Sequence, residues 1–204
     1  MIQWLKWLFI RIRDRFRFPQ SGILLPECKI RPMRADDIAH CEALYRLNEP
    51  GRFPDGHFDY FSKWLRGNSS LVLVAEVSGQ IRGIGGISKI QHAVYKIASL
   101  AFGMVHPDFH RKGFGTALLL ARISILPVPD KEWIMSISTI GESHTFYKRF
   151  GFTYTVTFDG GSGTKLDWYR TRVRKTDWDA CRARLQEANI TVDIGDAYIP
   201  TSST

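Results

Sequence analysis

The apolar positions change their period several times along the chain. Residues 29–32 predict a short strand, and the residues after it are apolar at helical spacing, which predicts a helix that begins near Asp36 or Asp37. Proline and glycine are frequent in residues 48–56 and predict a loop. Residues 57–66 predict a second, shorter helix.

Three strand patterns follow, and short turns separate them. Together they predict an antiparallel meander. In the third strand, strict alternation places Leu100, Phe102 and Met104 on one face. Pro107 ends this strand, because proline cannot donate to the ladder. The three stretches are residues 70–77, 81–90 and 95–105.

The second half of the chain predicts helices and strands in alternation. A helix at 114–126 is stopped by Pro127, and after residue 174 a helix is predicted with Trp178, Cys181 and Leu185 on one face. This pattern predicts an α/β fold with helices flanking a sheet. The remaining predicted elements are a strand at 132–138, a helix at 142–150, a strand at 152–158 and a polar tail after the last helix.

Composition limits the number of domains and the class of protein. With 204 residues, of which 44% are hydrophobic, the chain suits a single globular domain with short extensions. Its formal charge of +8 favours anionic partners, and nucleic acid, anionic lipid and phosphorylated small molecules all fit. Cys28, Cys41 and Cys181 are far apart and have no metal-ligand spacing, so we expect no metal and no disulfide frame.

Residues 1–18 are rich in both aromatic residues and arginine. They are too short and too charged to span a bilayer, which takes about 20 apolar residues, and they lack a signal-peptide cleavage site. Three interpretations stay open: a helix docked on the domain, a helix lying in an anionic membrane surface, and a mitochondrial targeting peptide or nucleic-acid arm. With the linker that follows, residues 1–22 form the N-terminal segment.

A basic glycine loop, VHPDFHRKGFGT at residues 105–116, lies between a predicted strand and a predicted helix. The first N–H groups of a helix have no intrahelical partner, and glycine lets an anion approach them closely, so the loop suits a pyrophosphate. Two well-known phosphate motifs are excluded. No Gly-Lys-Ser/Thr occurs in the chain, and Gly113-Phe114-Gly115 does not continue to the third glycine of a dinucleotide fingerprint.

The stretch VHPDFHRKGFGTALL resembles the acyl-CoA pyrophosphate loop of the GNAT superfamily of N-acetyltransferases. The resemblance covers about residues 28–174 and includes a second family-like segment, FYKRFGF. It implies a GNAT-like mixed sheet, with an antiparallel N-terminal meander and a parallel central pair, flanked by helices. It also implies acetyl-CoA as co-substrate, bound by His110, Arg111, Lys112, Gly113, Phe114, Gly115 and Thr116. His110 and Arg111 depart from the family pattern, which usually has Gln or Arg and then Gly there.

The resemblance further implies roles around this loop. Backbone groups of Gly103, Met104 and Val105 would pair with the pantetheine arm, because the strand before the loop splays from its parallel neighbour in this family. Tyr147 would act as the acid that protonates the thiolate, since a tyrosine hydroxyl is protonated at neutral pH, and Ser143 one turn earlier would touch the CoA arm. From the pattern alone, Gly103 could equally be a weak point of a core strand, and Tyr147 a core aromatic residue.

The residues leave the acceptor and the general base open. Glu76, His92, His106 and Glu142 are candidate bases, although each also fits a solvated surface group. The region 49–66 would select an unidentified amine, and residues 175–204 would cover the domain or form a homodimer contact. We expect a cytoplasmic enzyme that transfers acetyl to a primary amine by direct attack, with peripheral membrane contact through residues 1–18 as an option and nucleic acid not favoured. The alternatives are a non-catalytic acyl-CoA-binding module and a basic binding protein on the same fold.

Overall fold

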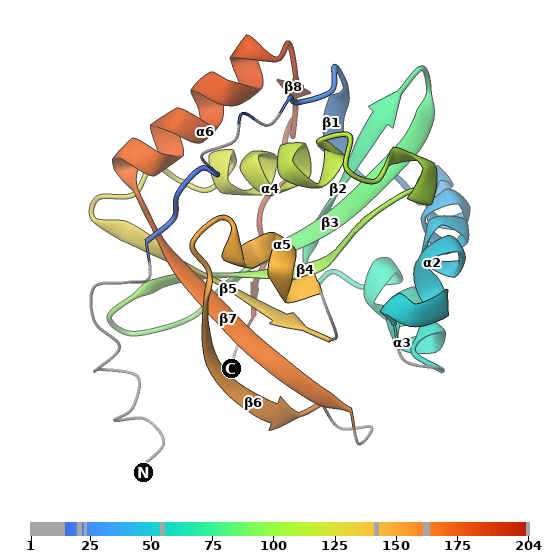
Figure 1. Ribbon diagram of the computed structural model, residues 1–204, viewed down its shortest axis with the longest axis horizontal. Coiled ribbons are helices and arrows are strands. Elements are labelled where there is room, and N and C mark those ends of the chain that lie inside the picture. The colour runs from blue at the N-terminus through green and yellow to red at the C-terminus, as the bar shows by residue number, and fades with distance from the viewer. Residues whose placement is uncertain are drawn as a thin grey trace.

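The computed structural model of the chain describes residues 15–19, 22, 24–53, 56–140, 143–160 and 164–202. These residues form one mixed sheet with helices on both faces (Figure 1). The strand order is β6-β7-β5-β4-β3-β2-β1-β8, and β9 pairs with β3. The strands are β1 (Lys29–Pro32), β2 (Leu71–Val77), β3 (Gln80–Ile90), β4 (Lys96–Val105), β5 (Glu132–Thr139), β6 (Thr153–Asp159), β7 (Lys165–Arg174), β8 (Thr191–Val192) and β9 (Thr201–Ser202).

The central strands have the pairing that the sequence predicts. The strands β1 to β4 form an antiparallel meander, and β4 and β5 are the parallel central pair. On the far side of β5, β7 runs antiparallel to it and β6 pairs with β7 at the edge. The expected mixed α/β sheet is therefore confirmed.

Two hydrophobic clusters lie on opposite faces of this sheet. One packs β-strand residues against the helices α4 and α6, and the other packs them against α2 and α3. Figure 1 shows α4 and α6 side by side, and the short helix α5 lies near the start of α4, where Phe146 faces Gly115. The helices are α2 (Ile38–Arg52), preceded by a 3-10 turn at Ala35–Asp37, α3 (Phe58–Arg66), α4 (Phe114–Ser124), α5 (His144–Lys148) and α6 (Lys175–Glu187).

Three elements differ from the sequence prediction in their bounds or their existence. The helix α2 runs to Arg52 through the predicted loop, and the inward-facing Asn48 in its last turns donates to the Leu44 carbonyl. The helix α5 is shorter than predicted and begins at His144. The strand β7 was not predicted, because lysine, aspartate and arginine obscure its alternation; its apolar and aromatic positions are Leu166, Trp168, Tyr169 and Val173 among charged neighbours.

The predicted faces of β4 are wrong beyond Leu100. Leu100 packs in the α4-side cluster, whereas Met104 belongs to the cluster on the α2 side and Phe102 packs against that cluster. The register between β3 and β4 shifts between the Ile84–Met104 pair and the Gly86–Ala101 pair. An extra residue in one strand reverses which face later side chains occupy, so strict alternation fails at this bulge.

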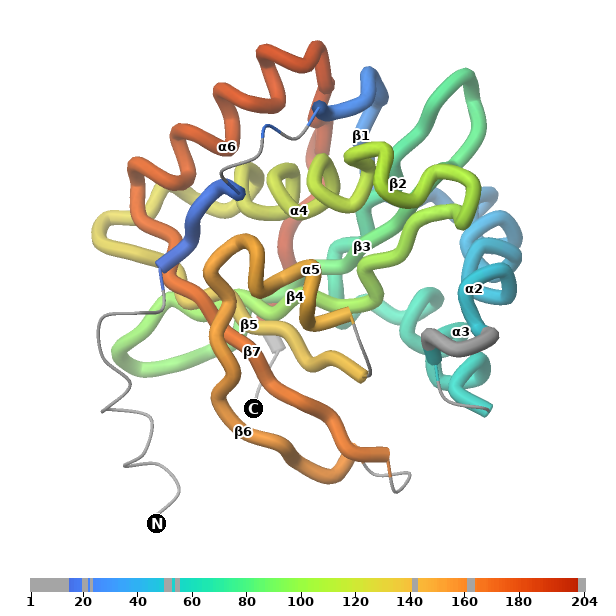
Figure 2. The backbone as a smooth tube through the Cα atoms, in the orientation of Figure 1, coloured from blue at the N-terminus to red at the C-terminus, as the bar shows by residue number. Residues whose placement is uncertain are grey.

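The described end of the N-terminal segment packs on the domain. The Phe16 N–H donates to the Arg172 carbonyl, and the Phe16 ring is buried and stacks on Phe150 with centroids 6.0 Å apart. Figure 2 shows the described parts of this segment passing beside α4 before the chain enters β1. Residues 1–14 lie outside the described residues, so the interpretations of that stretch stay predictions.

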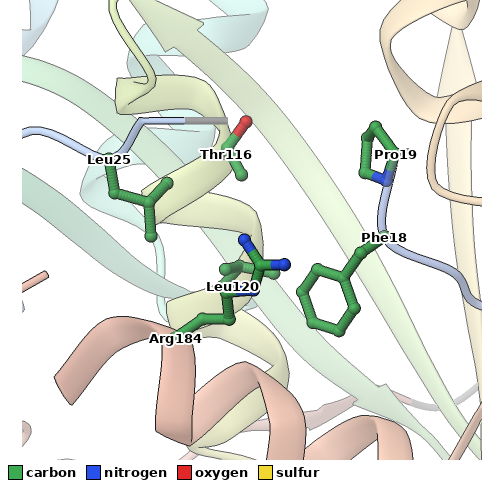
Figure 3. Close-up of a pocket in the computed structure, with 6 residues that line it drawn as sticks. All are labelled: Phe18, Pro19, Leu25, Thr116, Leu120 and Arg184. Carbon is green, nitrogen blue, oxygen red and sulfur yellow. The ribbon is translucent and has the colours of Figure 1, made fainter. Parts of the chain in front are cut away.

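A small hollow marks where this segment meets α4 and α6. Figure 3 shows the aromatic ring at position 18 beside the α4 side chains, with an arginine from α6 closing the hollow. Its lining is therefore apolar apart from one hydroxyl and one guanidinium group. The lining residues are Phe18, Pro19, Leu25, Thr116, Leu120 and Arg184.

The three cysteines are free and buried. Burial raises the pKa of the Cys28 thiol to about 11 and that of Cys41 to about 12, and it also raises the pKa of Cys181. Each thiol therefore stays protonated in the core.

Within the described residues, no helix is both long enough and apolar enough to cross a membrane.

Candidate active site

The strands β4 and β5 separate at their carboxyl ends. Their parallel pairing runs from Lys96–Trp133 to Leu100–Ile137 and goes no further, although β4 continues to Val105. On its other side β4 stays paired with β3 as far as Val105. The last five residues of β4 therefore present one backbone edge to a gap in the sheet, as expected from the family resemblance.

The bulge in β4 lies at this gap. Phe102 has a φ of 42°, in the left-handed region that a bulky residue rarely adopts. Such a conformation persists only where the surroundings hold it, and it is typical of functional sites. The bulge turns the Phe102 ring toward α3 and leaves the Cα of Gly103 facing α4 and α5.

The glycine loop then turns the chain into α4. Arg111 has a φ of 61° and Gly113, the residue before the helix, has a φ of 87°. The Ala117 N–H is bonded to the Gly113 carbonyl and starts the helical ladder, so the N–H groups of the preceding residues point out of the helix end. Left-handed residues alternating with helical ones form a concavity that binds anions.

The side chains of the loop have different environments. Those of Arg111 and Lys112 are exposed, whereas those of Phe114 and Thr116 are buried in the domain. The Lys112 ammonium lies 5.1 Å from the centre of the Phe109 ring. The loop thus presents positive charge and backbone N–H groups, while Phe114 contributes to the core.

His110 and Asn48 both bind the backbone at the end of β4. The His110 Nε2 atom lies 2.8 Å from the Val105 carbonyl oxygen, and the Asn48 side-chain amide donates to the same oxygen at 3.1 Å. The Val105 carbonyl is therefore engaged within the protein, and Asn48 joins α2 to the loop. Sequence reasoning missed Asn48, because the prolines and glycines of residues 48–56 predicted a loop there instead of the end of a helix.

The two glycines of the loop face different parts of the molecule. A Cβ on Gly113 would collide with the backbone of Leu24 and with Pro26 at 2.9 Å. A Cβ on Gly115 would lie 3.5 Å from the Phe146 ring and 3.8 Å from Val105, which are ordinary contacts. Gly113 is therefore required by packing, whereas Gly115 faces the space between α4 and α5.

Tyr147 projects from α5 toward the bulge. Its ring is buried and packs edge-on against Phe146 and Phe152, with centroids 5.0 and 5.3 Å away. Its hydroxyl lies 2.9 Å from the point that a Cβ on Gly103 would occupy. No hydrogen bond joins this hydroxyl to any residue that the structure describes, so it is available to a ligand.

Ser143 lies at the start of the same helix. Its side chain is exposed and its hydroxyl donates to the Ile140 carbonyl at 3.1 Å. The predicted contact with CoA stays a prediction.

The candidate bases are dispersed. Glu76 is bonded to Arg31 at 2.7 Å, and the His92 ring accepts backbone N–H groups of its own turn. The His106 ring accepts from the Asp108 N–H at 3.3 Å at the start of the loop. Glu142 lies outside the described residues, so the structure does not single out a base.

An aromatic group borders the bulge on the face opposite Tyr147. The Phe102 ring lies 4.6 Å from the Trp64 ring and 5.9 Å from that of the exposed Tyr60. This group belongs to the region 49–66 that we expect to select the acceptor. Phe102 itself was missed, because its position depends on the bulge.

Comparison with known proteins agrees with this geometry. Residues 68–154 match the model of the acetyltransferase (GNAT) domain, whereas no curated protein matches the sequence. Among solved structures, a GNAT-family protein from Desulfovibrio desulfuricans is similar with a TM-score of 0.56 and 17% identity, over 69% of this chain and 96% of that one.

Two further structures were solved with acetyl-CoA. One is the yncA protein of Salmonella typhimurium, with a TM-score of 0.52 and 20% identity over 72% of this chain and 94% of that one. The other is NAA60 of Arabidopsis thaliana, with a TM-score of 0.52 and 15% identity over 71% and 97% of the two chains. Residues 68–154 therefore match the GNAT acetyltransferase domain, and the chain shares the fold of these solved structures.

Proposed function

We propose that the protein is an acetyl-CoA-dependent N-acetyltransferase that transfers the acetyl group to a primary amine by direct attack. The observation that carries this proposal is the convergence of three features at one edge of the sheet. These are the anion-binding loop before α4, the unpaired end of β4 and the free hydroxyl of Tyr147. Together they offer an acyl thioester of a phosphorylated carrier an anion site, a backbone edge and a proton donor.

Acetyl-CoA fits the site from its phosphates to its thioester. The pyrophosphate lies at the N–H groups of residues 113–116, where the helix end and two exposed cations favour negative charge. Structural neighbours solved with acetyl-CoA support this choice of co-substrate. The pantetheine arm pairs with the open edge of β4 at Gly103–Val105. Asn48 and His110 already bind the Val105 carbonyl, so the N–H of Val105 is the group that pairs with the arm.

His110 has a structural role in this proposal. Its Nε2 atom is already hydrogen-bonded to the Val105 carbonyl, so the ring holds the loop against the end of β4. The phosphate contact that a Gln or Arg side chain would make is replaced by backbone N–H groups and by the charges of Arg111 and Lys112. A histidine at position 110 is therefore compatible with pyrophosphate binding by the loop.

The reaction needs one proton acceptor and one proton donor. The amine nitrogen attacks the thioester carbon, its bond to carbon forms, and the carbon–sulfur bond breaks with its electron pair going to sulfur. Tyr147 gives its hydroxyl proton to the thiolate, and the proton lost by the amine returns to Tyr147 through water. The net products are an amide and free CoA.

The acceptor approaches from the aromatic side of the bulge. Phe102, Trp64 and Tyr60 offer ring faces there, and such faces suit an ammonium group or an apolar substituent beside the amine. The identity of the acceptor stays open.

A panel of polyamines, amino-terminal peptides, lysine peptides and small aromatic amines tests the proposal. The purified full chain is incubated with acetyl-CoA and each amine, and free thiol is measured over time. We expect thiol release that depends on at least one amine. Acetyl-CoA binding without release for any acceptor would favour the non-catalytic module, and absence of binding would refute the proposal as a whole.

A further inference from the structure

A buried arginine lies beneath the proposed thioester site. Arg122 on α4 is 1% exposed and is among the largest fully buried side chains of the described residues. Its Nε donates to the Leu118 carbonyl at 3.0 Å and its Nη1 to the Gly86 carbonyl at 3.3 Å. Both partners are neutral.

No carboxylate among the described residues pairs with Arg122. The remaining nitrogen, Nη2, has no hydrogen-bond partner in the described part of the chain and is directed toward the bulge, 3.4 Å from the point that a Cβ on Gly103 would occupy. A buried charge is costly unless a counter-charge or a full set of hydrogen bonds compensates it. The charge of Arg122 therefore has no counter-charge among the described residues, and its Nη2 atom is the one that faces the bulge.

Missing side chains make room for the guanidinium group. A Cβ on Gly85 would lie 3.0 Å from the Arg122 Cζ atom, and a Cβ on Gly103 would contact both terminal nitrogens. Two neighbouring strands thus carry glycine where the guanidinium group rests against the sheet. An apolar residue at position 122 would fit this core without such openings.

Tyr147 meets Arg122 at the same point. The Tyr147 hydroxyl lies 2.9 Å from the Gly103 Cβ position and the Arg122 Nη2 lies 3.4 Å from it, so the two atoms are no more than about 6 Å apart. Opposite charges at such separations stabilise each other strongly in a buried site. The three atoms nearest to the Gly103 Cβ position are the Tyr147 hydroxyl oxygen and the two terminal nitrogens of Arg122.

We propose that Arg122 is the buried counter-charge for the leaving thiolate of CoA. This inference rests on the proposed function and adds a residue to it. As the carbon–sulfur bond breaks, its electron pair places a negative charge on sulfur beside Gly103, and the guanidinium group stabilises that charge. When Tyr147 protonates the sulfur, the charge moves to the tyrosine oxygen, which also lies near Arg122. The proton from the amine then restores the hydroxyl.

The ionisation of the CoA thiol in the complex tests this role without any acceptor. The full chain is saturated with CoA, and thiolate absorbance is followed against pH, with the same titration of the desulfo-CoA complex subtracted to remove tyrosine signals. We expect the pKa of the bound thiol to lie below that of free CoA, and Arg122→Met to raise it by about 1–3 units. Arg122→Lys should keep most of the effect.

Matched variants separate this role from a structural one. Arg182→Met removes one positive charge from α6, where the arginine lies over the Trp178 ring, and should leave the thiol pKa at the wild-type value. Arg122→Gln keeps donors for the two carbonyls and serves if Arg122→Met does not fold. Equal thiol pKa values in the wild type and a folded Arg122→Met or Arg122→Gln protein would overturn the inference.

The thiol pKa in the wild-type complex alone provides a second test of the counter-charge role. A bound thiol with a pKa equal to or above that of free CoA would refute the counter-charge role even if no Arg122 variant folds. Failure of the wild type to bind CoA would instead refute the proposed function itself.

Discussion

Tyr147 is positioned by aromatic packing. Phe146 and Phe152 hold its ring edge-on, and the missing side chain at Gly103 leaves space at its hydroxyl. A hydroxyl that is fixed in place but unbonded suits a group that must give its proton to a ligand. The family resemblance pointed to both Tyr147 and Gly103, but the sequence could not show that these residues face each other.

Tyr147→Phe should lower kcat by about 100-fold to 10,000-fold, the range typical of a lost general acid. Acetyl-CoA affinity should change little, because the hydroxyl is needed when the thiolate forms. Steady-state kinetics and calorimetry measure the two effects. Tyr169→Phe, a buried tyrosine on β7, is the control. Unchanged kcat in Tyr147→Phe would remove the hydroxyl from the rate-limiting chemistry.

At the scale of elements, the bulge in β4 determines the site. It separates the faces of Leu100 and Met104, turns Phe102 toward α3, and directs Gly103 toward Tyr147. The sequence predicted the strand and its end at Pro107, because these depend on local pattern. It could not predict the bulge, which depends on the register against β3 and is not encoded in the alternation of β4 itself.

The contact between β1 and the start of α2 predicts how the free energy of unfolding changes with pH. Asp37 lies at the start of α2 and accepts two hydrogen bonds from Arg31 on β1, one of them at 2.6 Å. This pairing holds the pKa of the Asp37 carboxyl below its usual range, although burial opposes the shift. A lowered folded-state pKa means that the stabilisation is present above the unfolded-state pKa and is lost as pH falls through the folded-state value.

Asp37→Asn should therefore lower the free energy of unfolding at pH 7 by about 1.5–3 kcal/mol, typical of hydrogen bonds to a charged group. Urea denaturation at a series of pH values measures it. The difference from wild type should shrink in acid, below an ordinary aspartate pKa. Asp36→Asn, at the exposed neighbouring position, should have little effect. A difference that stays constant down to the acid limit would contradict the ionic role of Asp37.

At the scale of the whole molecule, the N-terminal segment is part of the fold where it is described. Phe16 is 1% exposed between Phe18 and Phe150, and Gly151 allows the backbone of Arg15 to pass close by. The sequence left docking and membrane contact as alternatives, since an apolar, basic segment suits both. The described residues 15–18 favour docking for that part, and membrane contact through the preceding residues stays a prediction.

Phe16→Ala should lower the free energy of unfolding by about 3–5 kcal/mol, typical of a buried phenylalanine. Phe158→Ala, at a partly exposed ring on β6, is the control and should cost less. Thermal or urea unfolding measures both. Equal stabilities of Phe16→Ala and wild type would show that residue 16 does not belong to the core in solution.

Deleting residues 1–14 tests membrane contact separately from docking. If their arginines meet anionic head groups at about 1 kcal/mol each, the full chain should sediment with acidic vesicles, salt should release it, and the deletion should abolish the binding. Melting temperature should change little, since Phe16 remains. Equal vesicle binding by the full chain and the deletion variant would show that residues other than 1–14 bind the membrane.

The calorimetric titration of acetyl-CoA into wild type and Gly115→Glu tests the account most directly. A glutamate at this position would extend into the space between α4 and α5 and bring negative charge to the pyrophosphate site, whereas Gly113→Glu would also collide with Leu24. Gly115→Ala, whose Cβ makes only ordinary contacts, is the control for folding. We predict binding by wild type and no measurable binding by a folded Gly115→Glu protein. Equal affinity in the two would contradict the assignment of the loop as the CoA site.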